Sequence, residues 1–270
     1  NVVVGTEINS IGTRAFCLCT NLNGLAIGSR VTSIGEDAFR GCAGLTSVVI
    51  PDSVTTTGRR AFSGCTGLRN VTVGSGVTSV ADEAFSGCTS LTNIAIVNGA
   101  TTIGNSMFSG CTSLASVSVP GSVTIVGDGA FSGCTSLTNV SIGDGATTIG
   151  NSMFSGCTSL RSVEMPDNDT SIGNGAFTDC TSLTSVVIPD SVTSIGSSQF
   201  LRCSSLTNVT IGSGVTTIGN SMFSGCTSLR SVSIGGNATI IGNGAFYGCT
   251  GLTSMVIPER VREIVADTFH

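Results

Sequence analysis

The chain has very little of the chemistry on which most enzymes and nucleic-acid-binding proteins depend. Its 270 residues include no tryptophan and no lysine, one tyrosine, and one histidine, which is His270, so arginine supplies all 11 positive charges. Charged residues make up 10% of the chain, and the net charge is −5. Nucleic-acid binding needs clustered Lys and Arg, and Ser-His or Cys-His catalysis needs a histidine beside the nucleophile. We therefore expect neither nucleic-acid binding nor enzymatic activity.

Three further absences narrow the function. No run of 18 or more apolar residues occurs, so the sequence predicts no membrane-spanning segment within this chain. The cysteines do not form the Cys-x-x-Cys pairs of zinc sites, because the one close pair, Cys17 and Cys19, has a single residue between its members. No glycine-rich phosphate loop stands between a strand and a helix. The sequence therefore predicts no metal site and no cofactor.

What the sequence has in abundance is repetition at a fixed interval of 23 residues. Every phenylalanine belongs to one column with that spacing: Phe16, Phe39, Phe62, Phe85, Phe108, Phe131, Phe154, Phe177, Phe200, Phe223, Phe246 and Phe269. Eleven of the twelve cysteines stand three residues after a phenylalanine, and only Cys17 is off register. Because one such unit cannot bury its own apolar face, the units must stack in register, which is typical of a solenoid.

Each unit predicts one strand and one compact turn. The tract from Leu206 to Ile211 ends in a Val-x-Ile alternation, which indicates a short strand with one buried face. The segment from Ile218 to Cys226 has apolar residues three to five apart, which favours a short helical or 3-10 turn on the opposite side. A second extended piece is an alternative around Val215-Thr216-x-Ile218. We predict an α/β-class solenoid over residues 1–270, with about eleven to twelve repeats in one domain.

The order I-G-x-x-A-F-x-G-C-T-S-L-T-S-V-V-I-P-x-S-V-T resembles the BspA-like leucine-rich repeat family, most closely at 34–54 and 172–192. The resemblance implies a curved solenoid with a parallel inner sheet, and an extracellular or cell-surface protein credited with adhesion. The repeats depart from the motif at Thr57, Asp169, Ala81 and Val265, where we expect local loosening. Because neither end shows a polar cap, we expect the chain to be a fragment of a longer protein.

The predicted binding surface is the solvent-facing side of the inner strands, which would meet a protein or glycan partner on the concave face. These positions are small and polar, so an alternative is that they are simply solvated strand residues. The candidates are the outward strand positions together with one arginine column beside them: Asn70, Thr72, Asn93, Ser116, Ser118, Asn139, Ser141, Ser162, Glu164, Asn208, Thr210, Ser231, Ser233, Arg69, Arg161 and Arg230.

Three other interpretations stay open at this point. A threonine column suggests ice binding, or simply β-branched residues suited to extended backbone: Thr32, Thr55, Thr78, Thr101, Thr124, Thr147, Thr170, Thr193, Thr216 and Thr239. The cysteine column suggests inert core packing, since free cysteine packs as a small apolar residue, with Cys17 and Cys19 as the one candidate pair for a different role. Finally, the missing caps suggest self-association within a larger extracellular assembly or filament.

Overall fold

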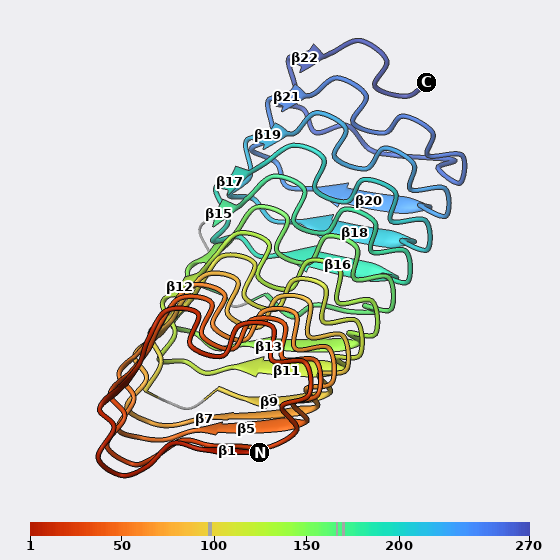
Figure 1. Ribbon diagram of the computed structural model, residues 1–270. Coiled ribbons are helices and arrows are strands. Elements are labelled where there is room, and N and C mark those ends of the chain that lie inside the picture. The colour runs from red at the N-terminus through yellow and green to blue at the C-terminus, as the bar shows by residue number, and fades with distance from the viewer. Residues whose placement is uncertain (97–98, 166, 169–170) are drawn as a thin grey trace.

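The chain coils into one elongated stack of similar turns that runs from the N-terminus at one end to the C-terminus at the other (Figure 1). This computed structural model describes residues 1–96, 99–165, 167–168 and 171–270. Within them every strand pairing is parallel and joins residues 23 apart, as in Asn208 with Ser231 and Ile11 with Ile34. The predicted parallel solenoid with a 23-residue repeat is therefore confirmed.

One side of the stack carries the longer strands, which we call the long-strand face. The strands of this row are β1 (Val2–Val3), β3 (Leu25–Ala26), β5 (Ser47–Ile50), β7 (Asn70–Val73), β9 (Asn93–Ala95), β11 (Ser116–Val119), β13 (Asn139–Ile142), β16 (Ser185–Ile188), β18 (Asn208–Ile211) and β20 (Ser231–Ile234). They pair as β1-β3, β5-β7-β9, β11-β13 and β16-β18-β20. Buried and exposed residues alternate along most of them, so each strand presents one face to the core and one to solvent.

The other side carries a second row of strands, each two residues long (Figure 1). They are β2 (Ser10–Ile11), β4 (Ser33–Ile34), β6 (Thr56–Thr57), β8 (Ser79–Val80), β10 (Thr102–Ile103), β12 (Ile125–Val126), β14 (Thr148–Ile149), β15 (Ser171–Ile172), β17 (Ser194–Ile195), β19 (Thr217–Ile218), β21 (Ile240–Ile241) and β22 (Glu263–Ile264). Strand β19 coincides with the second extended piece considered above, and that alternative is confirmed.

The predicted short helical or 3-10 turns are wrong, because the described residues contain no helix and the chain forms an all-β solenoid in place of an α/β one. In the arc after β19, N–H groups alternate between two kinds of partner. Met222 and Ser224 donate to carbonyls three residues earlier, whereas Ser221 and Phe223 donate to carbonyls of the next turn. Ser221 has a φ of 51°, in the left-handed region. A helix would need each N–H to bond within its own segment, so bonding between turns replaces it.

The phenylalanine column forms a continuous spine inside the stack. Neighbouring rings lie nearly parallel, with centroids between 5.1 and 5.9 Å apart. The rings from Phe39 to Phe246 are buried. The cysteine column lies beside them, and each buried thiol donates to the carbonyl of a phenylalanine one turn earlier, as Cys65 Sγ does to Phe39 O at 3.1 Å. Core packing, as predicted, accounts for both columns.

The departures from the repeat motif leave the stacking of turns in place. Thr57, at an isoleucine position, is buried, and its hydroxyl accepts a 3.3 Å hydrogen bond from the Ala81 N–H. In other turns the equivalent N–H is donated to a backbone carbonyl, as Gly104 N does to Val80 O. The Thr57 hydroxyl therefore takes the place of a backbone carbonyl as the acceptor for the Ala81 N–H. Asp169 lies outside the described residues.

Replacing Phe131 by alanine should destabilise the protein strongly. The ring stacks between Phe108 and Phe154 at 5.5 and 5.6 Å, so its removal leaves a cavity with a neighbour on each side. We expect a loss of about 3–5 kcal/mol in the free energy of unfolding, measured by guanidinium denaturation. Ile125→Ala is the matched control, since that side chain is 60% exposed and its loss should change stability by no more than about 0.5 kcal/mol. Equal losses in both variants would contradict a spine that stabilises the stack.

Candidate functional site

The long-strand face presents the polar side chains that the sequence predicted. All sixteen candidate residues are exposed. Eleven lie on strands and three form the arginine column beside them, while Ser162 and Glu164 lie in the equivalent segment 161–165, which forms no strand. In β11, Val117 points into the core while Ser116 and Ser118 face solvent. The period-2 alternation therefore places these residues correctly.

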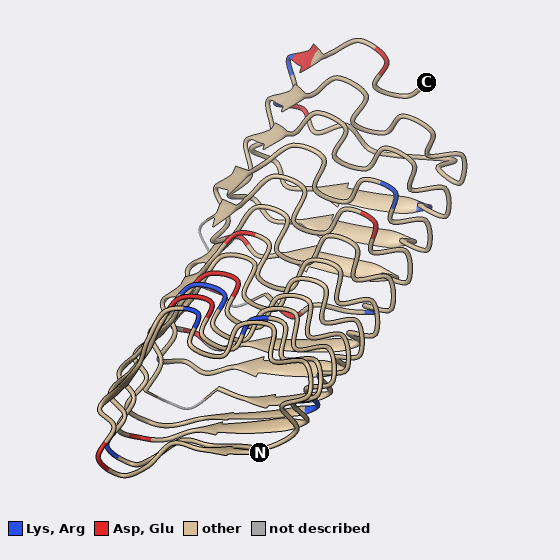
Figure 2. Cartoon of the chain, in the orientation of Figure 1, with Lys and Arg blue, Asp and Glu red and all other residues tan. Residues whose placement is uncertain are grey.

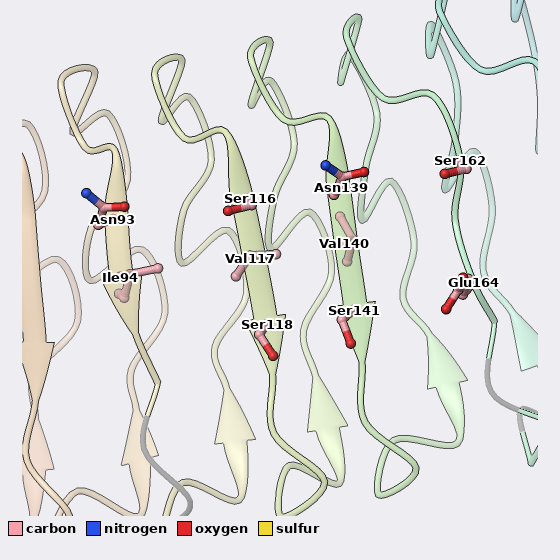
Figure 3. A pocket seen from close by; sticks show the side chains of 10 residues that line it. All are labelled: Asn93, Ile94, Ser116, Val117, Ser118, Asn139, Val140, Ser141, Ser162 and Glu164. Carbon is pink, nitrogen blue, oxygen red and sulfur yellow. The ribbon is translucent and has the colours of Figure 1, made fainter.

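Seven of the candidates meet around one open hollow of about 480 Å³, which we call the central hollow. Figure 3 shows its lining side chains in two rows that cross neighbouring turns, with Ile94, Val117 and Val140 between them. The upper row consists of Asn93, Ser116, Asn139 and Ser162, and the lower row of Ser118, Ser141 and Glu164. The remaining strand candidates lie elsewhere on the face: Thr72 and Ser233 line two other hollows, and Asn70, Asn208, Thr210 and Ser231 line neither.

Most polar groups in the central hollow are free to bind a ligand. In the described part of the chain, the hydroxyls of Ser116, Ser118, Ser141 and Ser162 have no hydrogen-bond partner in the protein, and neither has the Glu164 carboxylate. The amide of Asn139 is held by a 3.2 Å hydrogen bond to the Thr138 hydroxyl, which itself donates to Ala115 O. Its carbonyl oxygen is thereby oriented and left available. The hollow thus offers donors and acceptors on β9, on the paired strands β11 and β13, and on segment 161–165, which forms no strand.

The threonine column is arranged differently, because the hydroxyls of at least half of its members already form hydrogen bonds between turns. Thr32, Thr55, Thr101, Thr124 and Thr239 each donate through Oγ1 to a backbone carbonyl one turn earlier, at 3.1 to 3.4 Å. Thr170 lies outside the described residues. These hydroxyls join one turn to the next by hydrogen bonds. This structural role explains why threonine occurs at these positions without a ligand-binding role.

Charge is distributed unevenly along the stack. Figure 2 shows one cluster of charged residues on the first turns, away from the long strands, and the other charged residues scattered along the stack. The candidates Arg69, Arg161 and Arg230 share one column, but four and three turns separate them in sequence, or about 19 and 14 Å at ~4.8 Å per turn. They therefore do not combine into one anion site. Glu164 is the only charged side chain at the outward strand positions.

One charged cluster was missed at the sequence level. Asp37 is fully buried although it is ionisable, and it lies 3.2 Å from Arg60, 3.5 Å from Arg14 and 3.9 Å from Arg40. Arg14, Asp37 and Arg60 are spaced by 23 residues with alternating charge, and that spacing was the available signal. The guanidinium groups cover the carboxylate, so the cluster joins neighbouring turns and leaves no open carboxylate for a ligand.

The cysteines offer no accessible nucleophile in the core. Burial raises the pKa of the Cys88, Cys134 and Cys203 thiols to about 12. Only Cys19 is exposed, and Cys17 is half-buried. No group of three or more His, Cys, Asp and Glu side chains suited to a metal ion occurs among the residues the structure describes. Those residues also include no helix with the length and apolarity needed to cross a bilayer.

Comparison with known proteins identifies the repeat. The BspA type leucine rich repeat region, in six copies, matches residues 1–111, 61–183 and 170–270. The chain belongs to this BspA-type family. Leucine-rich repeat proteins of this kind are generally non-enzymatic binding scaffolds. No curated protein matches the chain.

Solved structures of leucine-rich repeat and related proteins resemble it. A leucine rich cell surface protein from Faecalibacterium prausnitzii is 31% identical, with 96% of this chain and 83% of that one covered and a TM-score of 0.59. A leucine-rich repeat protein from Bacteroides ovatus is 28% identical over 87% of this chain and 78% of that one, with a TM-score of 0.58. The pneumococcal vaccine antigen PcpA shares the fold at 18% identity, over 97% of this chain and 73% of that one, with a TM-score of 0.55.

The buried thiols predict an unusual loss of stability in alkali. Their pKa values of about 12 lie above the ordinary value of 9.0, so the folded chain holds protons that the unfolded chain releases. Their contribution is complete below about pH 9 and is lost as the pH rises towards 12, by about 1.4 kcal/mol per pH unit for each thiol. With no lysine and one tyrosine, the other groups that matter in this range are mainly the remaining buried cysteines, whose pKa values are also raised by burial, as for Cys111, Cys157 and Cys180.

We therefore expect the melting temperature to fall steeply between about pH 9 and pH 11. The triple variant Cys88→Ala, Cys134→Ala, Cys203→Ala should begin at lower stability, because it leaves cavities, and should then lose less with pH. A melting temperature that stays constant over this range in the natural chain would refute the assignment.

Proposed function

We propose that this chain is part of an extracellular or cell-surface scaffold that binds a protein or glycan partner through its long-strand face, in the manner of an adhesion module. The observation that carries the proposal is the central hollow, where Ser116, Ser118 and Ser141 on the paired strands β11 and β13, and Ser162 in the next turn, present unpaired hydroxyls. Polar groups elsewhere on the stack, such as the threonine column, are largely engaged between turns. The hollow is where a partner finds free hydrogen-bonding groups.

The geometry of the central hollow suits the binding of a partner better than simple contact with water. Ile94 lies between the two polar rows and is half-buried, so it adds a small apolar surface, whereas Val117 and Val140 point into the core and are only 5% and 7% exposed. The face has no Trp or Tyr, residues that dominate tight interfaces. We therefore propose moderate affinity at one site, increased by multivalent display on a surface.

The membership of the BspA-type family supports a surface location. A relative named as a cell surface protein covers nearly the whole chain at the identity given above. Adhesion, with a protein or a glycan as the ligand, is our extension of that likeness.

Blocking the central hollow should abolish partner binding. The double variant Ser118→Arg, Ser141→Arg places two long cations in the lower row without touching the core, since both side chains are exposed. Binding to immobilised extracellular matrix proteins and to a glycan array would be measured by surface plasmon resonance. We expect at least about a tenfold loss of affinity for any ligand of this face, equal to ~1.4 kcal/mol.

The matched control is Ser136→Arg, an exposed serine off the long-strand face, which should bind as the natural chain does. If no matrix protein or glycan binds the natural chain, the adhesion proposal fails. If a ligand binds equally well to the blocked variant, another surface carries the function. Concentration-dependent growth of the chain in light scattering, without ligand binding, would favour the structural-assembly alternative.

A further inference from the structure

Glu164 has a position unlike that of any other charged residue in the chain. The outward strand positions carry small polar or apolar side chains in every turn, and Glu164 is the single exception. Its side chain is exposed at the edge of the central hollow, in the row of Ser118 and Ser141 (Figure 3). Among the described residues its carboxylate has neither an ion pair nor a hydrogen bond, whereas Asp52, Asp128 and Asp190 each accept a hydrogen bond from the next turn.

An exposed apolar residue occupies the same position in the next turn. Val187 follows Glu164 by 23 residues and is 63% exposed in β16, as the exposed valines Val49 and Val256 are at the equivalent position of other turns. The two turns are adjacent, because Thr184 N–H donates to Arg161 O at 3.2 Å and Cys180 Sγ donates to Phe154 O at 3.2 Å. A carboxylate therefore has serine hydroxyls on the preceding turn and an aliphatic surface on the following one.

We propose that Glu164 and Val187 together receive a lysine or arginine side chain of a protein partner. The ammonium or guanidinium group pairs with the Glu164 carboxylate, and the aliphatic part of the side chain lies on Val187, as long basic side chains do on apolar surface. The hydroxyls of Ser141 and Ser162 lie in the same hollow and accept the remaining N–H groups. This inference rests on the proposed function and specifies the partner for that site.

The residues around Glu164 favour a basic side chain of a protein over an amino sugar as the ligand. A basic amino acid has an apolar stem that Val187 can cover, while a sugar amine sits directly on a polar ring. The long-strand face also lacks the aromatic side chains on which sugar rings usually stack. Arg161 does not compete for Glu164, because its side chain makes no ion pair with that carboxylate in the described part of the chain.

Capped tripeptides provide a direct test on the whole 270-residue chain. Ac-Thr-Lys-Thr-amide and Ac-Thr-Gln-Thr-amide would be titrated separately into the isotope-labelled protein, and amide chemical shifts followed by NMR. The lysine peptide should shift the amides of Ser141, Glu164 and Val187, with an affinity about two- to fivefold higher than that of the glutamine peptide, the range for an exposed ion pair. The preference should vanish in about 1 M salt, because the charges are then screened.

Two variants and a matched control distinguish the contribution of the Glu164 charge from that of packing on Val187. Glu164→Gln should bind both peptides equally, and Val187→Thr should weaken the lysine peptide more than the glutamine peptide because the lysine stem is longer. Asp144→Asn removes one exposed negative charge off the long-strand face and should keep the preference. Both substitutions in the site are at exposed positions, so circular dichroism should show unchanged folding.

Equal affinity of the two peptides for the natural chain would overturn the inference, as would a lysine preference that persists in Glu164→Gln or in about 1 M salt. Binding of a glucosamine oligomer at these residues without binding of the lysine peptide would assign the site to a glycan and also overturn it. If Ser118→Arg with Ser141→Arg abolishes binding of a matrix protein while Glu164→Gln has no effect, the proposed function stands and this inference fails.

Discussion

Stacking of like residues from successive turns is the constraint on which the whole structure depends. The Phe223 N–H donates to Ala245 O in the next turn, and the Phe223 and Phe246 rings then stack with centroids 5.3 Å apart. Because every pairing joins residues separated by 23, one insertion would displace rings, thiols and strands together. Each turn thus depends on its neighbours for both hydrogen bonds and burial, as in other solenoids.

This requirement explains why so much of the polar surface is structural. Outside the long strands, side chains bond to the next turn: Asp128 accepts from the Asn151 N–H at 2.8 Å, and Asn151 accepts from the Asn174 N–H at 2.7 Å. Left-handed residues such as Ser152 turn the backbone so that these bonds form, at a position where Gly129 and Gly175 serve in neighbouring turns. Such residues cost conformational energy, which the stack offsets through bonding on both sides.

On the long-strand face, most outward side chains are not needed to join the turns, because the strands there pair through their backbones. Its outward side chains are free to differ from turn to turn without loss of stacking, which is how Ser118, Ser141, Glu164 and Val187 stand in one column of the repeat. A regular scaffold therefore carries an irregular surface, and the irregularity is confined to positions that meet solvent. In the proposed function, binding specificity is encoded at those positions, since variation elsewhere would disturb packing.

The sequence alone determined the 23-residue register, the buried phenylalanine and cysteine columns, the parallel strands and the exposed polar row, because each follows from a local apolar pattern repeated in register. The helical turn was wrong for a physical reason: apolar residues spaced like those of Ile218, Met222 and Phe223 suit a helix and an arc of β-turns equally. Only the partner of each N–H distinguishes the two, and for Phe223 that partner lies in the next turn. Tertiary structure likewise decided the burial of Asp37 beneath arginines of neighbouring turns, and the gathering of seven polar side chains around one hollow, since both depend on how separate turns lie against each other.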